Sequence, residues 1–456
     1  CDHTHRHPLA LRRTTRRSGI RCRSMPLPWL RAHYVFVYAI LGALLPYLSI
    51  YAAARGLSDT QIGYVLGVFG LAVIVAPPVY TALADLWRNN RRIITFCYGL
   101  GTLTLLALAA AHSFPAILLA HLAFALAFTS LIPLLDGLTF ATIAQPAERP
   151  ERLPQNNNAN EANNADANGG SRRPPADDAP PRAAYRSIRV WGSFGFMVPG
   201  VGFAAAFAWL DLPDLTVASA AVLTAAAFAF VGLIAAQRLP AYRADQALAR
   251  RLPTLDALRA FARPPLRSFL SALFLLFASI SMYYTFYPPY LESLGVRPAY
   301  LGLITNLGVG IEVAFMLAAG ALLRRLGFRG VMILGIASQL VRMTLLAAFP
   351  HPVVGVATQV FHGPTVLALY LLPPMYLNHK ADPRCRNSML GLYAMTCLGF
   401  ARVLGAGAGG YISDAVGGEL PGRRLAFAVA AALALFATTL FAVAFRDRPQ
   451  LPEQRL

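Results

Sequence analysis

Three ionisable side chains lie deep inside long apolar runs of the sequence. Glu312 lies roughly 18 Å into its run at 1.5 Å per helical residue, Arg342 roughly 18–20 Å into the next, and His362 roughly 13–15 Å into the one after. A carboxylate beside an arginine and a histidine can gain or lose a proton as those partners approach or withdraw. The three residues therefore predict a proton-coupling cluster. The alternative is a structural ion pair between Glu312 and Arg342, with His362 as a hydrogen-bonded packing residue.

A second group has the chemistry to bind a polar or ring-shaped solute. Asp136 and Arg189 lie toward the same end of neighbouring runs, where a guanidinium and a carboxylate can hold carboxylate or hydroxyl groups. Arg402 lies deeper; we expect it to add positive charge to a central cavity, or to pair with Asp136 or Glu312. Aromatic residues that can stack on a ring complete the predicted substrate site: Trp191, Tyr283 and Tyr287. The alternatives are an interfacial salt bridge for Asp136 and Arg189, and an interfacial belt or helix packing for the aromatic residues.

The elements that carry these residues are too apolar for a soluble protein. Of 456 residues, 56% are hydrophobic and 13% are charged, against about 25% charged in soluble domains. The sequence predicts an all-α membrane protein with twelve transmembrane helices in two six-helix halves. The apolar runs lie at 33–52, 60–82, 93–111, 115–138, 187–209, 215–236, 268–291, 300–323, 330–349, 353–377, 388–412 and 425–445.

The charge of the loops between these runs alternates. One set of loops holds most of the arginines, whereas the opposite set offers only Arg55, Arg297, Arg423 and Arg424. The positive-inside rule therefore predicts a multi-pass protein of the cell (inner, cytoplasmic) membrane with both termini in the cytoplasm. Because the net charge of +19 follows this topology, nucleic-acid binding is disfavoured.

The chain divides into halves at 25–236 and 268–445 that repeat each other. Gly56-Leu57 and Ile62-Gly63 recur as Gly295-Val296 and Leu301-Gly302, and such repeats with a binding site at their interface are typical of one class of transporter. A central cytoplasmic loop at 237–267 contains a predicted surface helix at 252–261, and 446–456 is a cytoplasmic tail.

Two segments fall outside this repeat. The Asn-rich tract at 145–184 predicts a disordered insertion in the first half. The Arg-rich leader at 1–24 lacks the apolar core of a signal peptide. We expect it to be an upstream extension from a misassigned start; an organellar transit peptide is the alternative.

Several motifs resemble those of the major facilitator superfamily. Leu83-Ala84-Asp85 with Arg88, Arg91 and Arg92 resembles the signature between helices two and three, and Gly320 to Arg325 with Gly327 is its echo. The first copy is degenerate, because Thr81 and Asn89 stand where glycines are usual. The resemblance implies a gating motif whose ion pairs break as the halves rock, formed by Asp85, Arg88, Arg92, Arg324 and Arg325.

The segment from Tyr185 to Phe196 resembles the start of helix five in the phenylpropionate permease-like branch, which is related to lactose permease and nucleoside:proton symporters. Pro133 to Asp136 and Phe361 to Thr365 resemble further segments of that branch. The resemblance implies that Asp136 and Arg189 contact substrate, as the matching pair contacts sugar in lactose permease. Thr365 stands where lactose permease has a second acidic residue, so Glu312 is the sole proton carrier of the cluster or coupling is altered.

Together these features predict a secondary active transporter that works by alternating access. We expect proton-coupled uptake of a small organic solute, such as an aromatic acid, a nucleoside or a sugar; the alternatives are an efflux antiporter of the same fold and a non-transporting solute sensor. Because the sequence has no phosphate-binding loop, metal-ligand cluster or nucleophile arrangement, we expect no enzymatic activity and no cofactor besides the proton gradient. The expected partners are the solute, the proton and the lipid bilayer, with the protein as a monomer.

Overall fold

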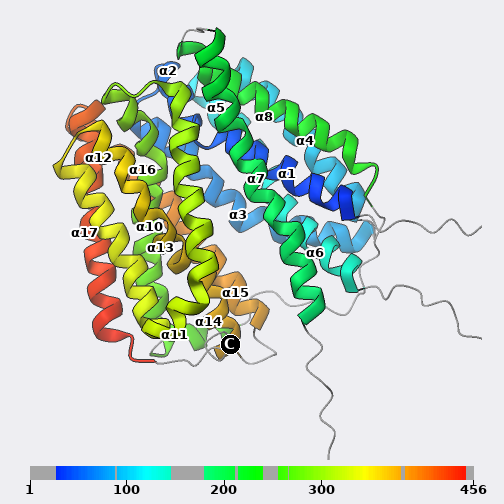
Figure 1. Cartoon of the computed structure of the whole chain (residues 1–456), viewed down its shortest axis with the longest axis vertical. Coiled ribbons are helices and arrows are strands. Elements are labelled where there is room, and N and C mark those ends of the chain that lie inside the picture. Colours follow the sequence, from blue (N-terminus) through cyan, green and yellow to red (C-terminus); the bar gives the residue numbers. More distant parts are fainter. Residues whose placement is uncertain are drawn as a thin grey trace, which may run out of the picture.

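The computed structural model describes residues 27–87, 90–144, 179–210, 214–239, 255–264, 266–381 and 386–447, and these are almost entirely helical (Figure 1). The leader at 1–24 and the tract at 145–178 lie outside the described residues. The helices of the first half are α1 (Leu27–Leu44), α2 (Leu48–Ala54), α3 (Asp59–Trp87), α4 (Asn90–Ala110), α5 (Phe114–Phe128), α6 (Leu131–Ala144), α7 (Ala179–Leu210) and α8 (Asp214–Ala236). After the connecting helix α9 (Leu255–Ala262), the second half contains α10 (Leu266–Ser293), α11 (Leu301–Ala348), α12 (Pro352–Ala357), α13 (His362–Val366), α14 (Leu372–Lys380), α15 (Arg386–Tyr393), α16 (Arg402–Ala415) and α17 (Glu419–Ala444).

Within the described ranges, eleven helical segments are long and apolar enough to cross a membrane. One of them, Pro298–Ala348, has 51 residues, or about 77 Å at 1.5 Å per residue, more than twice the ~30 Å hydrocarbon core. Gly327 breaks this segment with φ +67° and ψ 171°. The segment is therefore two crossings joined by a tight turn, which agrees with the predicted twelve.

The bounds of α7 and α9 differ from the sequence prediction. Helix α7 begins at Ala179, ahead of the predicted start at 187 and inside the predicted insertion. Pro180 and Pro181 are tolerated there because the first turn of a helix has N–H groups without helical partners. The predicted surface helix at 252–261 appears as α9, Leu255–Ala262.

The two halves are in backbone contact along α3 and α16, which belong to different halves. A Cβ added to Gly63 would lie 2.4 Å from the carbonyl oxygen of Ala406, and one added to Gly410 would lie 2.3 Å from that of Asp59. Glycine is therefore the residue that allows this approach, as at many helix contacts in membranes. We call the face where α1 begins and α17 ends the terminal face, and the opposite face, where α3 and α17 begin, the far face.

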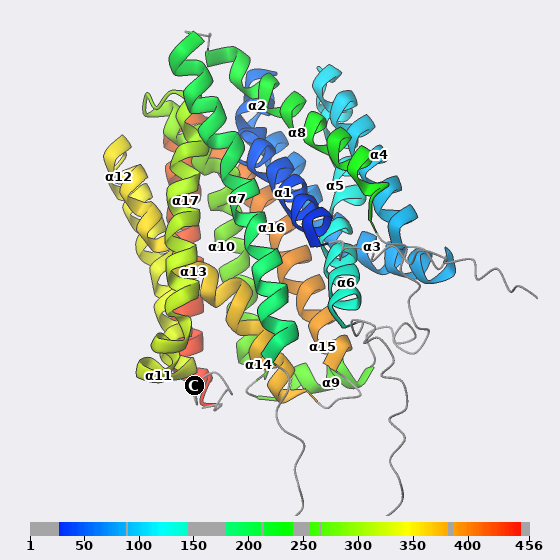
Figure 2. The same ribbon diagram turned by 45° about the vertical axis from the view of Figure 1, so that its right-hand side comes forward.

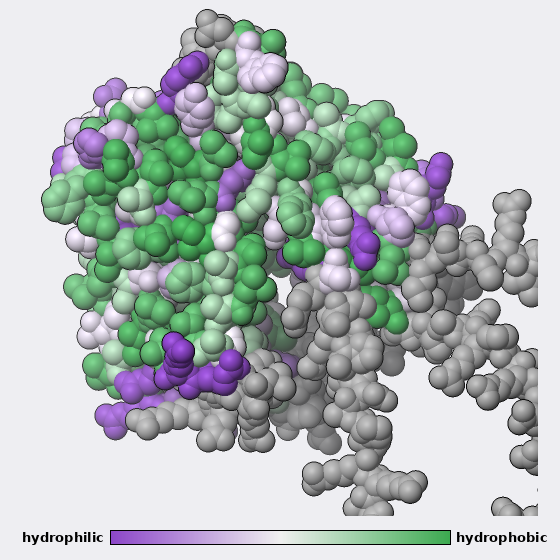
Figure 3. All heavy atoms as spheres, viewed as in Figure 1, coloured by the Kyte–Doolittle hydropathy of each residue, from purple (hydrophilic) through white to green (hydrophobic). Residues whose placement is uncertain are grey.

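The surface follows the expectation for a membrane protein. In Figure 3 the face in view is largely apolar, and hydrophilic residues gather near the bottom, where the turn of α11 lies in Figure 1. Arg324 and Arg325 of that turn are exposed. Figure 2 shows α9 at the same end of the molecule, beside α14 and α15.

Candidate functional site

The predicted proton-coupling residues meet at one place in the second half. His362 lies between the other two, with its Nε2 3.5 Å from Oε2 of Glu312 and its Nδ1 3.5 Å from Nη1 of Arg342. The Glu312 side chain is 25% exposed, whereas Arg342 is fully buried. The cluster thus consists of an accessible carboxylate and a buried guanidinium group, with the imidazole of His362 between them.

Tyrosines of α10 surround the buried side of this cluster. The Arg342 guanidinium lies 4.3 Å from the ring centroid of Tyr283, and its Nε donates to the carbonyl oxygen of Thr358 at 3.2 Å. Gln359 accepts from Tyr283 at 3.3 Å and donates to Tyr287 at 3.1 Å. Both tyrosines, predicted to bind substrate, are therefore buried in a network that positions Arg342.

Asp136 and Arg189 gather around two tyrosines of α1. The Tyr34 hydroxyl donates to Asp136 Oδ1 at 2.5 Å, and Arg189 donates to the Tyr38 hydroxyl with its guanidinium 4.4 Å from that ring. Arg189, Asp136 and Glu312 all act electrostatically on Tyr38. Tyr38 therefore lies near both the predicted substrate pair and the coupling carboxylate, a placement that the sequence did not reveal.

Arg402 reaches from the second half to the first. It follows a π-helical turn at Ala394–Ala401, and its guanidinium carbon lies 4.5 Å from the ring centroid of Phe69 on α3. Within the described ranges it has neither of the acidic partners that the sequence left open, Asp136 and Glu312. A cation at this depth costs at least roughly 2.5–3.5 kcal/mol on insertion scales unless it meets a partner or water.

A polar network that the sequence analysis missed joins the halves at the far face. Asp59, at the start of α3, forms a buried ion pair with Arg423 of α17, with an Oδ1–Nη2 distance of 3.1 Å, and accepts a 2.5 Å hydrogen bond from Ser413. Asp414 accepts from the backbone N–H groups of Asp59 and Thr60 at 3.1 and 2.8 Å, which caps α3. We call Asp59, Ser413, Asp414 and Arg423 the far-face lock. A signal was present, since Arg423 is one of the few arginines on its side.

The comparison with known families decides what this arrangement belongs to. Residues 29–450 match the model of the family described as Nucleoside H+ symporter. The chain belongs to the nucleoside H+ symporter family. It is therefore a multi-pass membrane transporter of a proton-coupled symport family, as the sequence predicted.

Relatives of this symporter are named for different substrates. The chain is 26% identical over 395 residues to the maltose permease of Geobacillus stearothermophilus, covering 85% of this chain and 86% of that protein. It is 24% identical over 357 residues to a probable 3-phenylpropionic acid transporter of Escherichia coli, covering 76% and 81%. The crystal structure of the nucleoside transporter NupG is similar with a TM-score of 0.75 at 18% identity, over 93% of this chain and 100% of that one. The predicted major facilitator fold is thus confirmed.

Trp191 and the described arginines of the gating motif of this symporter are exposed. Trp191 is 42% exposed, 6.0 Å from the ring of Phe194, on the exposed side of α7. Arg92, Arg324 and Arg325 are exposed; the side chain of Asp85 and all of Arg88 lie outside what the structure describes. Trp191 therefore lies on the exposed side of α7, whereas Arg189 contacts Tyr38 of α1.

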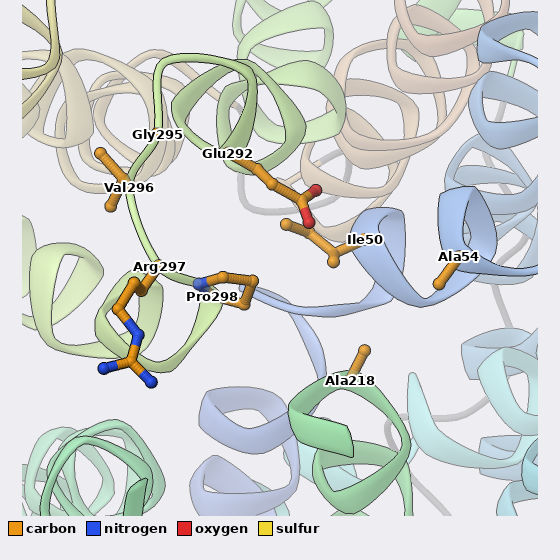
Figure 4. A pocket seen from close by; sticks show the side chains of 8 residues that line it. All are labelled: Ile50, Ala54, Ala218, Glu292, Gly295, Val296, Arg297 and Pro298. Atoms are coloured by element: carbon orange, nitrogen blue, oxygen red, sulfur yellow. The ribbon is translucent and has the colours of Figure 1, made fainter. Parts of the chain in front are cut away.

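The symporter also has a pocket of about 360 Å³ at the far face, between α2, α8 and the loop after α10. In Figure 4, Glu292 points toward Ile50, while Arg297 points away from the pocket. Its lining residues include none of the predicted site residues. Among the described residues no group of His, Cys, Asp and Glu side chains forms a metal site.

Proposed function

We propose that this symporter takes up a small organic solute with a proton, using Glu312 as the proton carrier. The observation that carries the proposal is the geometry of Glu312: a partly exposed carboxylate, 3.5 Å from His362, which in turn contacts buried Arg342. A proton on Glu312 removes its negative charge, and with that charge its electrostatic attraction to Arg342. The proton then changes the contacts inside the second half without any metal or nucleotide.

The solute binds between the halves, where Asp136 and Arg189 face Tyr34 and Tyr38 and where Arg402 crosses from the second half. Nucleosides, sugars and aromatic acids remain the candidate classes of solute, and the names of the relatives include all three. In this proposal the protein spans the inner membrane and has both termini in the cytoplasm. The far-face lock is closed, so the state described here is the one from which solute leaves toward the terminal face.

Proteoliposomes with an imposed pH gradient test the coupling. Glu312→Gln is expected to abolish uphill accumulation while preserving exchange of internal for external solute, because exchange needs no net proton movement. Glu292→Gln, which neutralises an exposed carboxylate at the far face, is the matched control and should accumulate solute normally. If Glu312→Gln still accumulates solute against its gradient, Glu312 is not the proton carrier.

A further inference from the structure

Arg402 lies in the middle of its membrane crossing, and among the described residues no carboxylate lies beside it. The crossing that contains it runs from Ser388 to Ala415, so Arg402 is about 21 Å from the start of a helix some 42 Å long. Phe69 covers one side of the guanidinium. The groups that interact with it electrostatically are the hydroxyls of Tyr284 and Tyr370 and the imidazole of His121, none of them a carboxylate.

Three other arginines of the second half each have an oxygen partner. Arg342 donates to the carbonyl oxygen of Thr358, Arg423 pairs with Asp59, and Arg424 donates to the carbonyl oxygen of Ala347. The guanidinium of Arg402 has five N–H donors, and within the described ranges none of them donates to a protein oxygen. The donors of Arg402 are therefore available to a ligand that enters between the halves.

The charged side chains around Arg402 and between the two halves also add up to a net positive charge. Among the described residues, its permanently charged cations are Arg189, Arg342 and Arg402, and its carboxylates are Asp136 and Glu312. Once Glu312 carries a proton, one carboxylate is left among three guanidinium groups. A neutral solute would leave this excess of positive charge unbalanced in the membrane, whereas an anion would reduce it.

We infer that Arg402 is a binding residue for the negatively charged group of the solute, and that the solute is an organic monoanion bearing a carboxylate. A guanidinium binds a carboxylate through two parallel hydrogen bonds, and the face of Phe69 keeps the fork in place. This inference rests on the proposed function. One proton on Glu312 and one monoanion on Arg402 cross together, so the transport cycle moves no net charge.

The test uses a solute panel in proteoliposomes: 3-phenylpropionate, its neutral amide, uridine and maltose. The carboxylate is expected to accumulate with an imposed pH gradient and its amide to be excluded. A potassium diffusion potential set by valinomycin should leave the rate unchanged. Arg402→Gln should weaken the affinity for the carboxylate roughly 10- to 100-fold, the loss expected for charge-assisted hydrogen bonds.

Two further variants keep the test decisive. Arg424→Gln removes an arginine of the same half that bonds a carbonyl oxygen elsewhere, and should bind the carboxylate as the wild type does. Arg402→Lys keeps the charge without the fork; it should retain electroneutral uptake at lower affinity, which covers the case in which Arg402→Gln does not fold.

Three outcomes overturn the inference while leaving proton-coupled transport intact: accumulation of a neutral solute in place of the carboxylate, unchanged carboxylate affinity in Arg402→Gln, or uptake that the potential accelerates. If no solute of the panel accumulates with the pH gradient, the proposed function fails, and the inference fails with it.

Discussion

Removing Asp59 from the far-face lock should shift the balance between the two conformations of this transporter. Asp59 is 4% exposed and Arg423 is 11% exposed, so Asp59→Asn leaves a nearly buried guanidinium without its counter-ion when the far face is closed. Losing one partner of a buried ion pair costs about 3–5 kcal/mol. Arg423 keeps hydrogen bonds to Pro289 and Ser293, at 2.9 and 2.7 Å, so we expect about 2–3 kcal/mol. The ratio of far-face-open to far-face-closed molecules should then rise roughly 30- to 150-fold.

Electron–electron distance measurements can follow this shift. Spin labels introduced by His112→Cys and His351→Cys lie on exposed far-face loops of opposite halves. Of the five native cysteines, Cys97 and Cys397 are buried, and the other three, Cys1, Cys22 and Cys385, are replaced by serine in the labelled protein. Asp59→Asn and Arg423→Gln should each increase the population with a long distance between labels. The double variant should add little, because both substitutions remove the same interaction. Glu292→Gln is the control for charge loss at this face. An unchanged distance distribution in Asp59→Asn, or fully additive effects in the double variant, would refute the reasoning.

Two smaller predictions concern the substrate pair and the turn of α11. Tyr34→Phe removes the 2.5 Å hydrogen bond to Asp136 and should weaken solute binding about 10- to 100-fold in equilibrium binding measurements, since a hydrogen bond to a charged group is worth roughly 1.5–3 kcal/mol; unchanged affinity would mean that Asp136 does not bind solute in the position that Tyr34 holds. Gly327→Ala places a side chain at φ +67° and ψ 171° and should lower the free energy of unfolding by about 1–3 kcal/mol. Gly320→Ala, where a Cβ meets only the flexible end of Arg324 at 3.6 Å, is the control in thermal unfolding, and an equal loss in both variants would contradict the role of the turn.

The sequence was informative where the physical signal is local. The length of an apolar run predicts a crossing, and the turn at Gly327, which joins two crossings in one helical segment, came at the predicted place between 323 and 330. The apolar run predicted at 187–209 matches the candidate crossing Ser187–Leu210. Helix α7 itself begins earlier, at Ala179, because hydropathy does not register a helix that continues beyond the apolar run. The three residues proposed for coupling, which the structure brings together, were also singled out from the sequence, because an ionisable side chain inside an apolar run is rare and costly.

The sequence by itself thus determined the crossings, their repeat in two halves, and which charged side chains lie at membrane depth, since each of these depends on hydropathy and on position along a helix. Only the tertiary structure decided which of those side chains meet. His362 between Glu312 and Arg342, Arg402 over Phe69, and Asp59 with Arg423 depend on helix rotation, on the π-helical turn before Arg402 and on the docking of two halves. The close approach of α3 and α16 at Gly63 and Gly410 is likewise a property of two distant segments. No pattern within one helix encodes it, because the partner that a side chain finds is set by the packing of the whole bundle.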